Sequence, residues 1–439
     1  MTMEDRMKNA IALFKKKRVI VVGDVMLDRY TFGVVERLSP EAPIPVVRKL
    51  SEKFVLGGAA NVAANLASLG AGVDLFGVVG NDHNKDLVID ILREKNINGK
   101  GLLVHRTKPT ILKHRIVSGT GHQLLRVDEE DTANLDSGAE EEMVRRMGDV
   151  IKSCDVIILS DYAKGVFSKK LVHAILKAAK AHGKKVLADF KPKNKEMFAG
   201  VDLLSPNLKE AMEMSGLERI EEIGAALMEY FGADVMLTRS GDGISAFKKS
   251  DKSHHHVPGK KIKVFDVSGA GDAAIAVAAL ALASGLGLED AAHLANTAGA
   301  IVVQKPGTAT ISIEELESAL QAEHHIESLP IVAKVWGYEK WLENNDKYCS
   351  KLLSLNKGYQ CSLHYHKVKD ETFVVTQGHV RLELGKEVHH LREGNFMRIP
   401  PGVPHRFMGV EDSLIIEVST HHDEADSHRI EESRKADIK

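Results

Sequence analysis

Short apolar runs alternate with helical patterns over the first three quarters of the chain. The runs that have the length and composition of buried strands are 18–23, 156–160, 185–189, 203–205 and 235–238. The segments with helical periodicity are 61–69, 170–181, 209–214 and 220–231. This alternation predicts an α/β domain in which helices cover both faces of a parallel sheet, with ligands at the carboxyl ends of the strands. Asp24, Asp161, Asp189 and Asn207 lie at or just beyond such ends.

The pattern changes in the last quarter of the chain. Short strands separated by turn residues are expected at 373–377, 380–384, 396–399 and 413–418, which is typical of a small antiparallel barrel or sandwich. The polar segment 323–330 ends in a proline and has the composition of a linker. We therefore predict domains at 10–322 and 332–424, joined by a linker at 323–331. The charged tail at 425–439 is expected to fray.

Residues 39–47 contain three prolines among apolar positions. Because proline cannot donate a hydrogen bond to a central strand, this segment is expected to leave the main sheet. Residues 273–283 form the longest apolar run, which is Ala-rich and too short to span a bilayer, so we expect a buried helix there.

Composition narrows the classes of function. The net charge is −2 and aromatic residues make up 5% of the chain, which argues against a nucleic-acid partner. The three cysteines, Cys154, Cys349 and Cys361, show no CxxC spacing, and Cys154 is expected in the core. This sparse, odd count favours a reducing compartment. With no apolar leader or spanning segment visible, we expect a cytoplasmic protein without a membrane partner.

A glycine-rich turn, Asp266–Asp272, precedes the Ala-rich helix. Gly269, Ala270 and Gly271 would place backbone N–H groups around an anion at the helix N-terminus. A carboxylate in such an anion hole cannot bind phosphate, so Asp272 is expected to take a proton from an attacking hydroxyl. A second glycine pair, Gly57 and Gly58, leads into a helix that carries Asn61, which suits a small polar ligand.

These two segments and their spacing resemble those of the ribokinase, or phosphofructokinase-B-like, sugar kinases over residues 10–320. The resemblance is closest to bacterial heptose-7-phosphate kinases, and it rests on GDVMLDRY (23–30), SPEAPIPVV (39–47), QLLRVDEE (123–130), LSDYAKG (159–165) and ANTAGAIVVQKPGTATIS (295–312). The chain departs from the usual pattern at Phe190 and Ala273, and it lacks the HxGH motif of the adenylyltransferase that usually accompanies such kinases.

The resemblance implies a ribokinase-like sandwich with a small β lid, a lid-mediated homodimer, and ATP-dependent phosphorylation of a sugar phosphate, most plainly C1 of a heptose 7-phosphate. It implies sugar binding by Asp28, Asp24, Gly57, Gly58, Asn61 and Lys191. It implies binding of ATP and Mg²⁺ by Asn207, Glu210, Thr238, Ser240, Gly241, Gly243 and Asn296. A phosphate already on the sugar needs a cation, for which the candidates are Arg106, Lys113, Arg115, Lys164 and Lys191.

The last predicted domain contains a second group of candidate site residues. His364, His366 and Glu371 stand between Gly358 and Gly378, and His405 follows Pro400-Pro401-Gly402, the spacing of the two cupin motifs. Two histidines two residues apart on a strand point to one face, so four ligands are expected around Zn²⁺, Fe²⁺, Mn²⁺ or Ni²⁺. The segment resembles the cupin of mannose-6-phosphate isomerases, which implies an isomerase acting on the same sugar.

Two alternatives stay open. The kinase could act on another sugar, and the cupin could be a non-catalytic ligand sensor. Two further sets of residues are assigned no site: His254–His256 is expected in a solvated turn, and Cys361 is expected on the strand face opposite His364.

Overall fold

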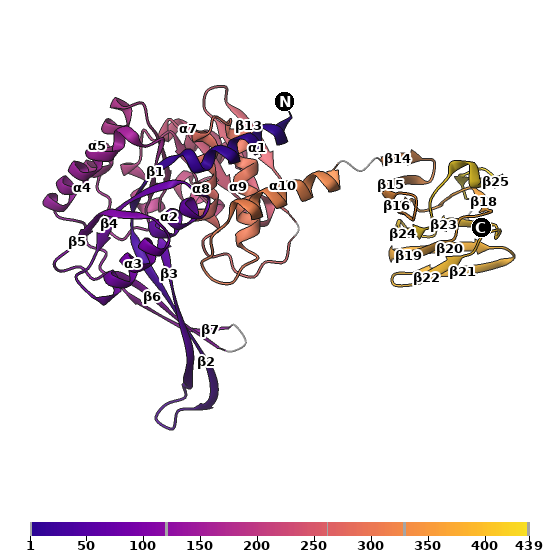
Figure 1. The fold of residues 1–439 in the computed structure, drawn as a ribbon, viewed down its shortest axis with the longest axis horizontal. Helices are drawn as coiled ribbons and strands as arrows, with labels where there is room; N and C mark the ends of the chain where they lie inside the picture. Colours follow the sequence, from indigo (N-terminus) through magenta and orange to yellow (C-terminus); the bar gives the residue numbers. More distant parts are fainter. Residues whose placement is uncertain (1, 119–121, 261, 328–330, 437–439) are drawn as a thin grey trace. The chain divides into compact units, whose positions relative to one another are not determined.

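The computed structural model describes residues 2–118, 122–260, 262–327 and 331–436. The chain divides into two compact units, residues 1–320 and 321–439, each with its own core (Figure 1). The first unit is built on a nine-stranded sheet and the second is entirely β. This confirms the predicted α/β domain followed by a separate all-β domain.

The nine-stranded sheet has the order β13-β12-β11-β10-β9-β8-β1-β4-β5. Its strands are β1 (Arg18–Gly23), β4 (Gly72–Val79), β5 (Asn98–Val104), β8 (Val156–Ser160), β9 (Lys185–Asp189), β10 (Leu203–Leu204), β11 (Asp234–Thr238), β12 (Ile244–Lys248) and β13 (Ser253–Val257). All neighbours pair in parallel except β11–β12 and β12–β13. All five predicted strands are therefore present. The predicted solvated turn at His254–His256 is wrong: these residues form edge strand β13, where His254 stacks on Phe247.

Helices cover both faces of this sheet (Figure 1). They are α1 (Met3–Leu13), α2 (Ala59–Ser68), α3 (His83–Glu94), α4 (Ser137–Val150), α5 (Lys169–Ala181), α6 (Leu208–Ser215), α7 (Ile220–Phe231), α8 (Ala270–Ala283), α9 (Leu288–Val302) and α10 (Ile313–Glu327). Alternate residues of β1 point to opposite cores: Val19 and Val21 pack with α2 and α8, and Ile20 and Val22 pack with α5 and α7. No helix in the described ranges is both long enough and apolar enough to cross a membrane.

Short 3-10 turns link several of these elements. They are η1 (Phe14–Lys16), η2 (Ile151–Ser153), η3 (Pro192–Met197) and η4 (Ser240–Asp242).

A second sheet, which we call the lid, has the order β3-β2-β6-β7. Its strands are β2 (Val25–Leu38), β3 (Pro45–Gly58), β6 (Ile111–Ser118) and β7 (Gln123–Glu129). The proline-rich segment forms the turn from β2 to β3, and Pro45 opens β3, which is an edge strand as its proline requires. The lid projects from the rest of the first unit (Figure 1). It is connected to the main sheet at both ends, because β2 follows β1 and β3 leads into α2.

The ends of the first unit differ from the predicted boundaries. The unit begins before residue 10, because α1 buries Met7 and Ile11 and Arg6 donates two hydrogen bonds to Asp290. The predicted linker is partly helical, since α10 continues to Glu327. Ile331, the last residue of that linker, opens a strand, and residues 328–330 lie outside the described residues.

The second unit consists of two facing antiparallel sheets. One contains β14 (Ile331–Lys334), β15 (Gly337–Asn344), β16 (Cys349–Leu355), β24 (Ser413–Ser419), β19 (Glu371–Gln377) and β22 (Phe396–Ile399) in that order. The other contains β21 (Glu387–Arg392), β20 (His379–Leu384), β23 (His405–Gly409), β17 (Tyr359–Gln360) and β26 (Arg434–Lys435), with β18 (Leu363–His366) and β25 (Ser427–Glu431) attached. Alternating residues of β16, β19 and β24 are buried, as expected where one face of each strand packs inside a barrel.

The prediction that the charged tail frays is wrong for residues 425–436, and residues 437–439 lie outside the described residues. Residues 424–426 form the 3-10 turn η5 (Glu424–Asp426), β25 pairs with β18, and β26 pairs with β17. The sequence pattern gave no sign of this because Ser427–Glu431 has no alternation of apolar side chains. Backbone pairing holds the segment in place instead.

Candidate active site and metal centre

Asp272 lies in the first turn of α8 and is 4% exposed. Its Oδ2 accepts a hydrogen bond from the side-chain amide of Asn61 at 2.7 Å, and its Oδ1 accepts one from the Tyr162 hydroxyl at 2.7 Å. The two glycine-rich segments, which are more than 200 residues apart, are thus joined at one carboxylate. Sequence reasoning assigned no role to Tyr162, although it lies within LSDYAKG, one of the segments that carried the family resemblance.

Gly269 is the N-cap of α8 and adopts φ +81°, a conformation that favours glycine. A Cβ at this position would lie 2.9 Å from the Asn61 side-chain nitrogen. The N–H groups of the first helical turn, which includes Ala270 and Gly271, have no partner within the helix. This turn can therefore receive an anion beside a carboxylate that can accept a proton.

The charge state of Asp272 fits a base. Burial raises its pKa to about 6, although the hydrogen bonds from Asn61 and Tyr162 favour the charged form. Burial likewise raises the pKa of Asp189, at the end of β9, to about 7, with Glu210 and Asp272 adding to the increase. Carboxylates whose pKa values lie this near neutrality are characteristic of functional sites.

Asp28, for which sugar binding is predicted, lies on β2 and is 4% exposed. Its Oδ1 accepts a hydrogen bond from Arg115 of β6 at 2.6 Å, and its Oδ2 accepts one from the Thr308 hydroxyl at 3.1 Å. A Cβ on Gly57 would lie 2.8 Å from Asp28 Oδ2, so a glycine is needed here to leave room for this carboxylate. Gly58, at φ +57°, is the N-cap of α2.

Asp24, for which sugar binding is also predicted, contacts the loop that follows β8. It is fully buried, and its carboxylate accepts hydrogen bonds from the backbone N–H groups of Tyr162, Lys164 and Val166 at 2.8, 3.0 and 3.3 Å. Burial and the charge of Asp161 raise its pKa to about 6. With both oxygens engaged by the backbone, Asp24 holds the loop that carries Tyr162.

Asn207 and Glu210 open α6 as a capping box, in which each side chain accepts the other's backbone N–H. Glu210 also accepts a hydrogen bond from Lys191 Nζ at 2.6 Å, and Lys191 lies over the Tyr162 ring at 5.3 Å. Lys191, Glu210, Tyr162 and Asp272 therefore form one chain of contacts. The carboxylate and amide oxygens at the start of α6 are donors of the kind that Mg²⁺ prefers.

The other residues predicted to bind ATP lie at the end of β11, in the turn that follows it, and on α9. Thr238 ends β11 and bridges to Asn207, and η4 follows with Ser240 at φ +53° and Gly243 at φ +89°. Gly241 lies within η4. Asn296, on α9, donates a hydrogen bond to the Pro258 carbonyl.

Most of the cations predicted for a second phosphate already have carboxylate partners. Lys113 lies 3.6 Å from Asp128 and Lys164 lies 2.6 Å from Glu130, as Arg115 and Lys191 lie beside Asp28 and Glu210. Arg106 is exposed and has no carboxylate partner in the ranges that the structure covers.

In the second unit, His364, His366 and His405 converge, with ligand atoms within 4.8 Å of one another. Each Nδ1 lies at hydrogen-bond distance from a backbone carbonyl: Ser362 at 2.9 Å, Asp426 at 3.0 Å and Val403 at 3.1 Å. Because a carbonyl can only accept, each Nδ1 carries the proton and each Nε2 keeps its lone pair. His405 Nε2 is buried and has no hydrogen-bond partner, as expected of a nitrogen that can bind a metal ion.

Glu371 completes the donor set. Its two oxygens lie 3.3 Å from His405 Nε2 and 3.6 Å from His366 Nε2, and one of them also accepts a hydrogen bond from Lys369 at 2.6 Å. Burial would raise the pKa of Glu371, but the adjacent His405 imidazole and the Lys369 charge outweigh it and hold the pKa below its usual range. Burial lowers the pKa of His364 to about 4, so this imidazole is neutral at pH 7. A neutral imidazole and an ionised carboxylate are the forms that bind metal.

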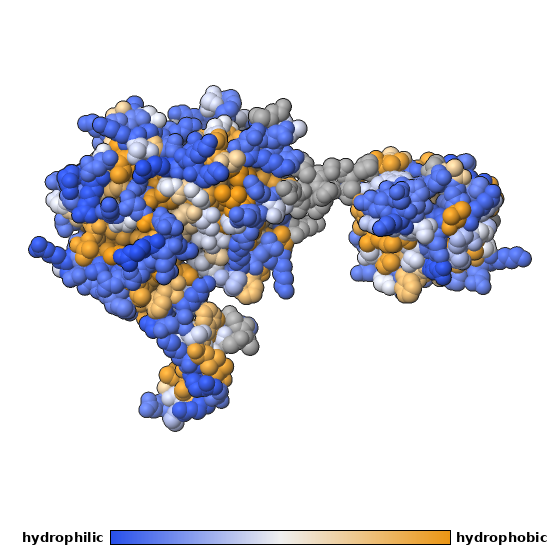
Figure 2. All heavy atoms as spheres, viewed as in Figure 1, coloured by the Kyte–Doolittle hydropathy of each residue, from blue (hydrophilic) through white to orange (hydrophobic). Residues whose placement is uncertain are grey.

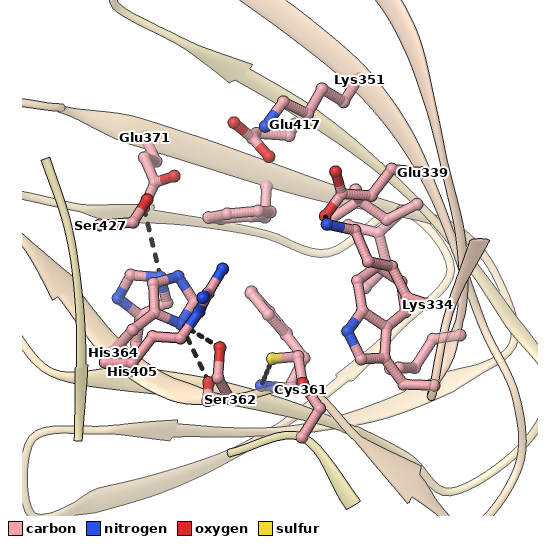
Figure 3. Close-up of a pocket in the computed structure, with 18 of the residues that line it drawn as sticks. Lys334, Glu339, Lys351, Cys361, Ser362, His364, Glu371, His405, Glu417 and Ser427 are labelled. Carbon is pink, nitrogen blue, oxygen red and sulfur yellow. Dashed lines mark hydrogen bonds and ion pairs between the residues drawn. The ribbon is translucent and has the colours of Figure 1, made fainter. Parts of the chain in front are cut away.

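These groups line a cavity of about 400 Å³ inside the barrel (Figure 3). Lys369 is 3% exposed and pairs with both Glu371 and Glu417, a contact that sequence reasoning missed because neither Lys369 nor Glu417 belongs to the motif. Cys361 lines the same cavity, so its predicted placement on the opposite face is wrong. Burial raises the pKa of its thiol to about 12, and its sulfur accepts a hydrogen bond from Phe407 N–H, so Cys361 is still not a metal ligand.

Comparison with known proteins finds relatives of both units. Residues 16–316 match the pfkB family of carbohydrate kinases, and residues 351–419 match the cupin domain. The chain is 40% identical over 317 residues to the bifunctional protein HldE of Desulfatibacillum aliphaticivorans, a match that covers 71% of this chain and 64% of that protein. It is 39% identical over 348 residues to HldE of Hyphomonas neptunium, covering 77% and 71%.

Solved structures show the same fold for the first unit. A putative ribokinase from Agrobacterium tumefaciens superposes with a TM-score of 0.58 at 21% identity, covering 70% of this chain and 98% of that one. Phosphofructokinase-2 from Escherichia coli superposes with a TM-score of 0.58 at 16% identity, covering 70% and 98%. From the match over residues 16–316 and the identity to these relatives, the chain belongs to the pfkB family of carbohydrate kinases, and a cupin domain follows its kinase domain.

Proposed function

We propose that the first unit transfers the γ-phosphoryl group of ATP to C1 of D-glycero-D-manno-heptose 7-phosphate, giving the 1,7-bisphosphate. The observation that carries this proposal is the buried Asp272 at the N-terminus of α8, beside Asn61 and within one chain of contacts to Lys191 and Glu210. The five segments that resemble heptose-7-phosphate kinases, and the 40% identity to the HldE relative, support this choice of sugar.

In this reaction the C1 hydroxyl oxygen forms a bond to the γ-phosphorus while the bond from that phosphorus to the β,γ-bridging oxygen breaks. Asp272 accepts the hydroxyl proton. The N–H groups of the first turn of α8, around Gly269 and Gly271, stabilise the charge on the transferred phosphoryl group. Asn207 and Glu210 would hold Mg²⁺, which neutralises the phosphate charge when bound. Asp28 would accept hydrogen bonds from sugar hydroxyls.

For the second unit we propose a divalent transition metal held by His364, His366, His405 and Glu371, and isomerase activity on the same class of sugar phosphate. When bound, such a metal polarises a carbonyl or hydroxyl oxygen. Lys369 and Glu417 line the cavity beside the metal site and would hold or move a proton there. The alternative, a cupin that only senses a ligand and regulates the kinase, requires the same metal site but no turnover.

The direct test is a panel of sugars and sugar phosphates given to the whole protein with ATP, with ADP release as the readout. Heptose 7-phosphate is expected to give the highest kcat/KM. The Asp272→Asn variant, supplied with the same sugars, reports isomerisation without phosphoryl transfer. Isomerisation that disappears with His364→Ala, His366→Ala would support a catalytic cupin, whereas stoichiometric metal without turnover on any of the sugars would favour the sensor.

A further inference from the structure

A second lysine in the cupin cavity differs from Lys369 in its surroundings. Lys351 lies on β16, faces inward and is 4% exposed. Whereas Lys369 pairs with two glutamates, Lys351 has no carboxylate oxygen within 4.0 Å among the residues that the structure places. Its ammonium group lies 4.0 Å from the Trp341 ring centroid and 3.4 Å from His422 Nδ1. A buried cation with so little compensation is costly unless an anion joins it.

Trp341 adds a second unsatisfied donor to this cluster. Its indole N–H is buried without a hydrogen-bond partner, and its ring packs edge-on against His422 with a centroid distance of 4.9 Å. Buried donors are normally paired, so an orphaned indole N–H beside an unneutralised ammonium group needs an explanation. A negatively charged acceptor bound at this place would explain the ammonium group directly.

Lys351 lines the same cavity as the metal site. The cavity wall includes Lys351, His364 and His405, and Figure 3 shows Lys351 on a different side of the space from the two imidazoles. Glu417 and Ser427 supply further polar groups to the cavity wall, and Phe373 and Phe407 supply apolar surface. A ligand that spans this space would meet hydroxyl-binding groups along its length and a cation at one side.

We propose that the cupin cavity binds a polyol that carries an anionic group, phosphate or carboxylate, with the anion paired to Lys351 and the hydroxyl groups directed toward the imidazole cluster. This inference rests on the proposed metal site and identifies the chemical class of its ligand. It is independent of the identity of the kinase substrate, because Lys351 and its neighbours all belong to the second unit.

The chain offers a specific probe of this cavity. Its two tryptophans, Trp336 and Trp341, both lie in the second unit, so the tryptophan fluorescence of the whole protein reports on the cupin alone. Zinc-loaded, full-length protein without ATP is titrated with fructose 6-phosphate, sedoheptulose 7-phosphate and gluconate, and with neutral fructose and sedoheptulose. At least one anionic compound is expected to change the fluorescence saturably, with an affinity at least about tenfold above that of its neutral counterpart.

Lys351→Met is expected to weaken binding of that anionic compound about tenfold or more and to leave binding of the neutral sugar unchanged. Lys351→Arg should restore most of the affinity, and Lys347→Met removes an exposed lysine nearby as a matched control. If Lys351→Met does not fold, Lys351→Gln serves instead. Binding to gluconate but not to the phosphates would identify a sugar acid, and the reverse would identify a phosphate ester.

Equal affinity of the Lys351 variant and the wild-type protein for every anionic compound would overturn the proposal, as would the absence of saturable binding by all three. Zinc content is measured in parallel. A variant that keeps one zinc per chain but loses anion binding supports the role of Lys351. Wild-type protein that does not retain zinc would instead contradict the proposed metal site, so the two failures are distinguishable.

Discussion

The Asp272 carboxylate has a donor on each oxygen, Asn61 on one and Tyr162 on the other. An asparagine at this position keeps the shape and can keep one of these contacts, but it cannot accept a proton from the sugar. We expect Asp272→Asn to fold and to bind ATP as the wild-type protein does, while kcat falls by roughly 10²-fold or more, the usual scale for loss of a general base. Steady-state kinetics with ADP release check this, and turnover near the wild-type level would remove Asp272 from the mechanism.

The pKa of Asp272 makes a second prediction at the residue scale. The base must be ionised to work, and burial raises its pKa to about 6, so kcat/KM is expected to fall about tenfold per pH unit below that value. The hydrogen bond from Tyr162 favours the ionised form. Tyr162→Phe removes it, and the acidic limb of the pH profile should move to higher pH. Tyr230→Phe, which changes an exposed tyrosine, should leave the limb in place.

Sequence motifs identified Asp272 and Asn61, because glycine and small residues are needed wherever backbone approaches an anion. The same motifs could not identify Tyr162, whose hydroxyl reaches Asp272 only because Asp24 binds three N–H groups of the intervening loop. That relation depends on the loop conformation, which no local residue pattern specifies. The contacts of Asp24 with this loop could not be predicted for the same reason.

At the scale of elements, buried strands were predictable and polar edge strands were not. Strands such as β1 and β8 lie in the middle of the sheet and are apolar apart from one terminal residue each, Arg18 and Ser160. β13 and β25 contain polar or charged residues and form because a partner strand supplies hydrogen bonds, which is information that their own sequence lacks. Failure to predict β25 matters most, because Asp426, just before this strand, contacts His366 of the proposed metal site.

Asp426, just before β25, connects the C-terminal segment to that site. Its side chain accepts hydrogen bonds from the backbone N–H groups of Lys367, Val368 and Lys369, and its carbonyl accepts one from His366 Nδ1. We expect Asp426→Ala to loosen the loop between two metal ligands and to weaken zinc binding about tenfold or more, the scale for groups that orient ligands. Competition with a chromogenic chelator measures the affinity.

Asp412→Ala is the matched control, because Asp412 accepts a backbone N–H from Lys357 in another loop. This control should bind zinc as the wild-type protein does. Unchanged zinc affinity in Asp426→Ala would mean that the C-terminal segment contributes nothing to the site.

At the scale of the whole molecule, the lid is the surface that most needs a partner. Leu50, Leu125 and Val127 are 58%, 54% and 44% exposed, and Figure 2 shows apolar side chains gathered on this projection. Exposed apolar surface of this kind favours association. We propose a homodimer formed through the lid and expect a dimer in sedimentation velocity at micromolar concentration. Leu125→Glu with Val127→Glu should give a monomer, and a wild-type protein that sediments as a monomer would contradict the proposal.

The two units have separate cores and separate candidate sites, and this separation can be tested on the whole chain. His364→Ala combined with His366→Ala removes two of the three converging imidazoles, and it should abolish stoichiometric transition-metal binding. The proposed kinase site consists of Asp272, Asn207 and Glu210, none of which lies in the second unit. Its kcat and KM should therefore stay within about twofold of the wild-type values. Metal analysis and ADP release on one preparation measure both properties. Retention of one metal ion per chain would place the metal elsewhere. Loss of kinase activity together with the metal, in a protein that remains folded by circular dichroism, would show that the cupin regulates the kinase, and the sensor would then replace the isomerase as the better account.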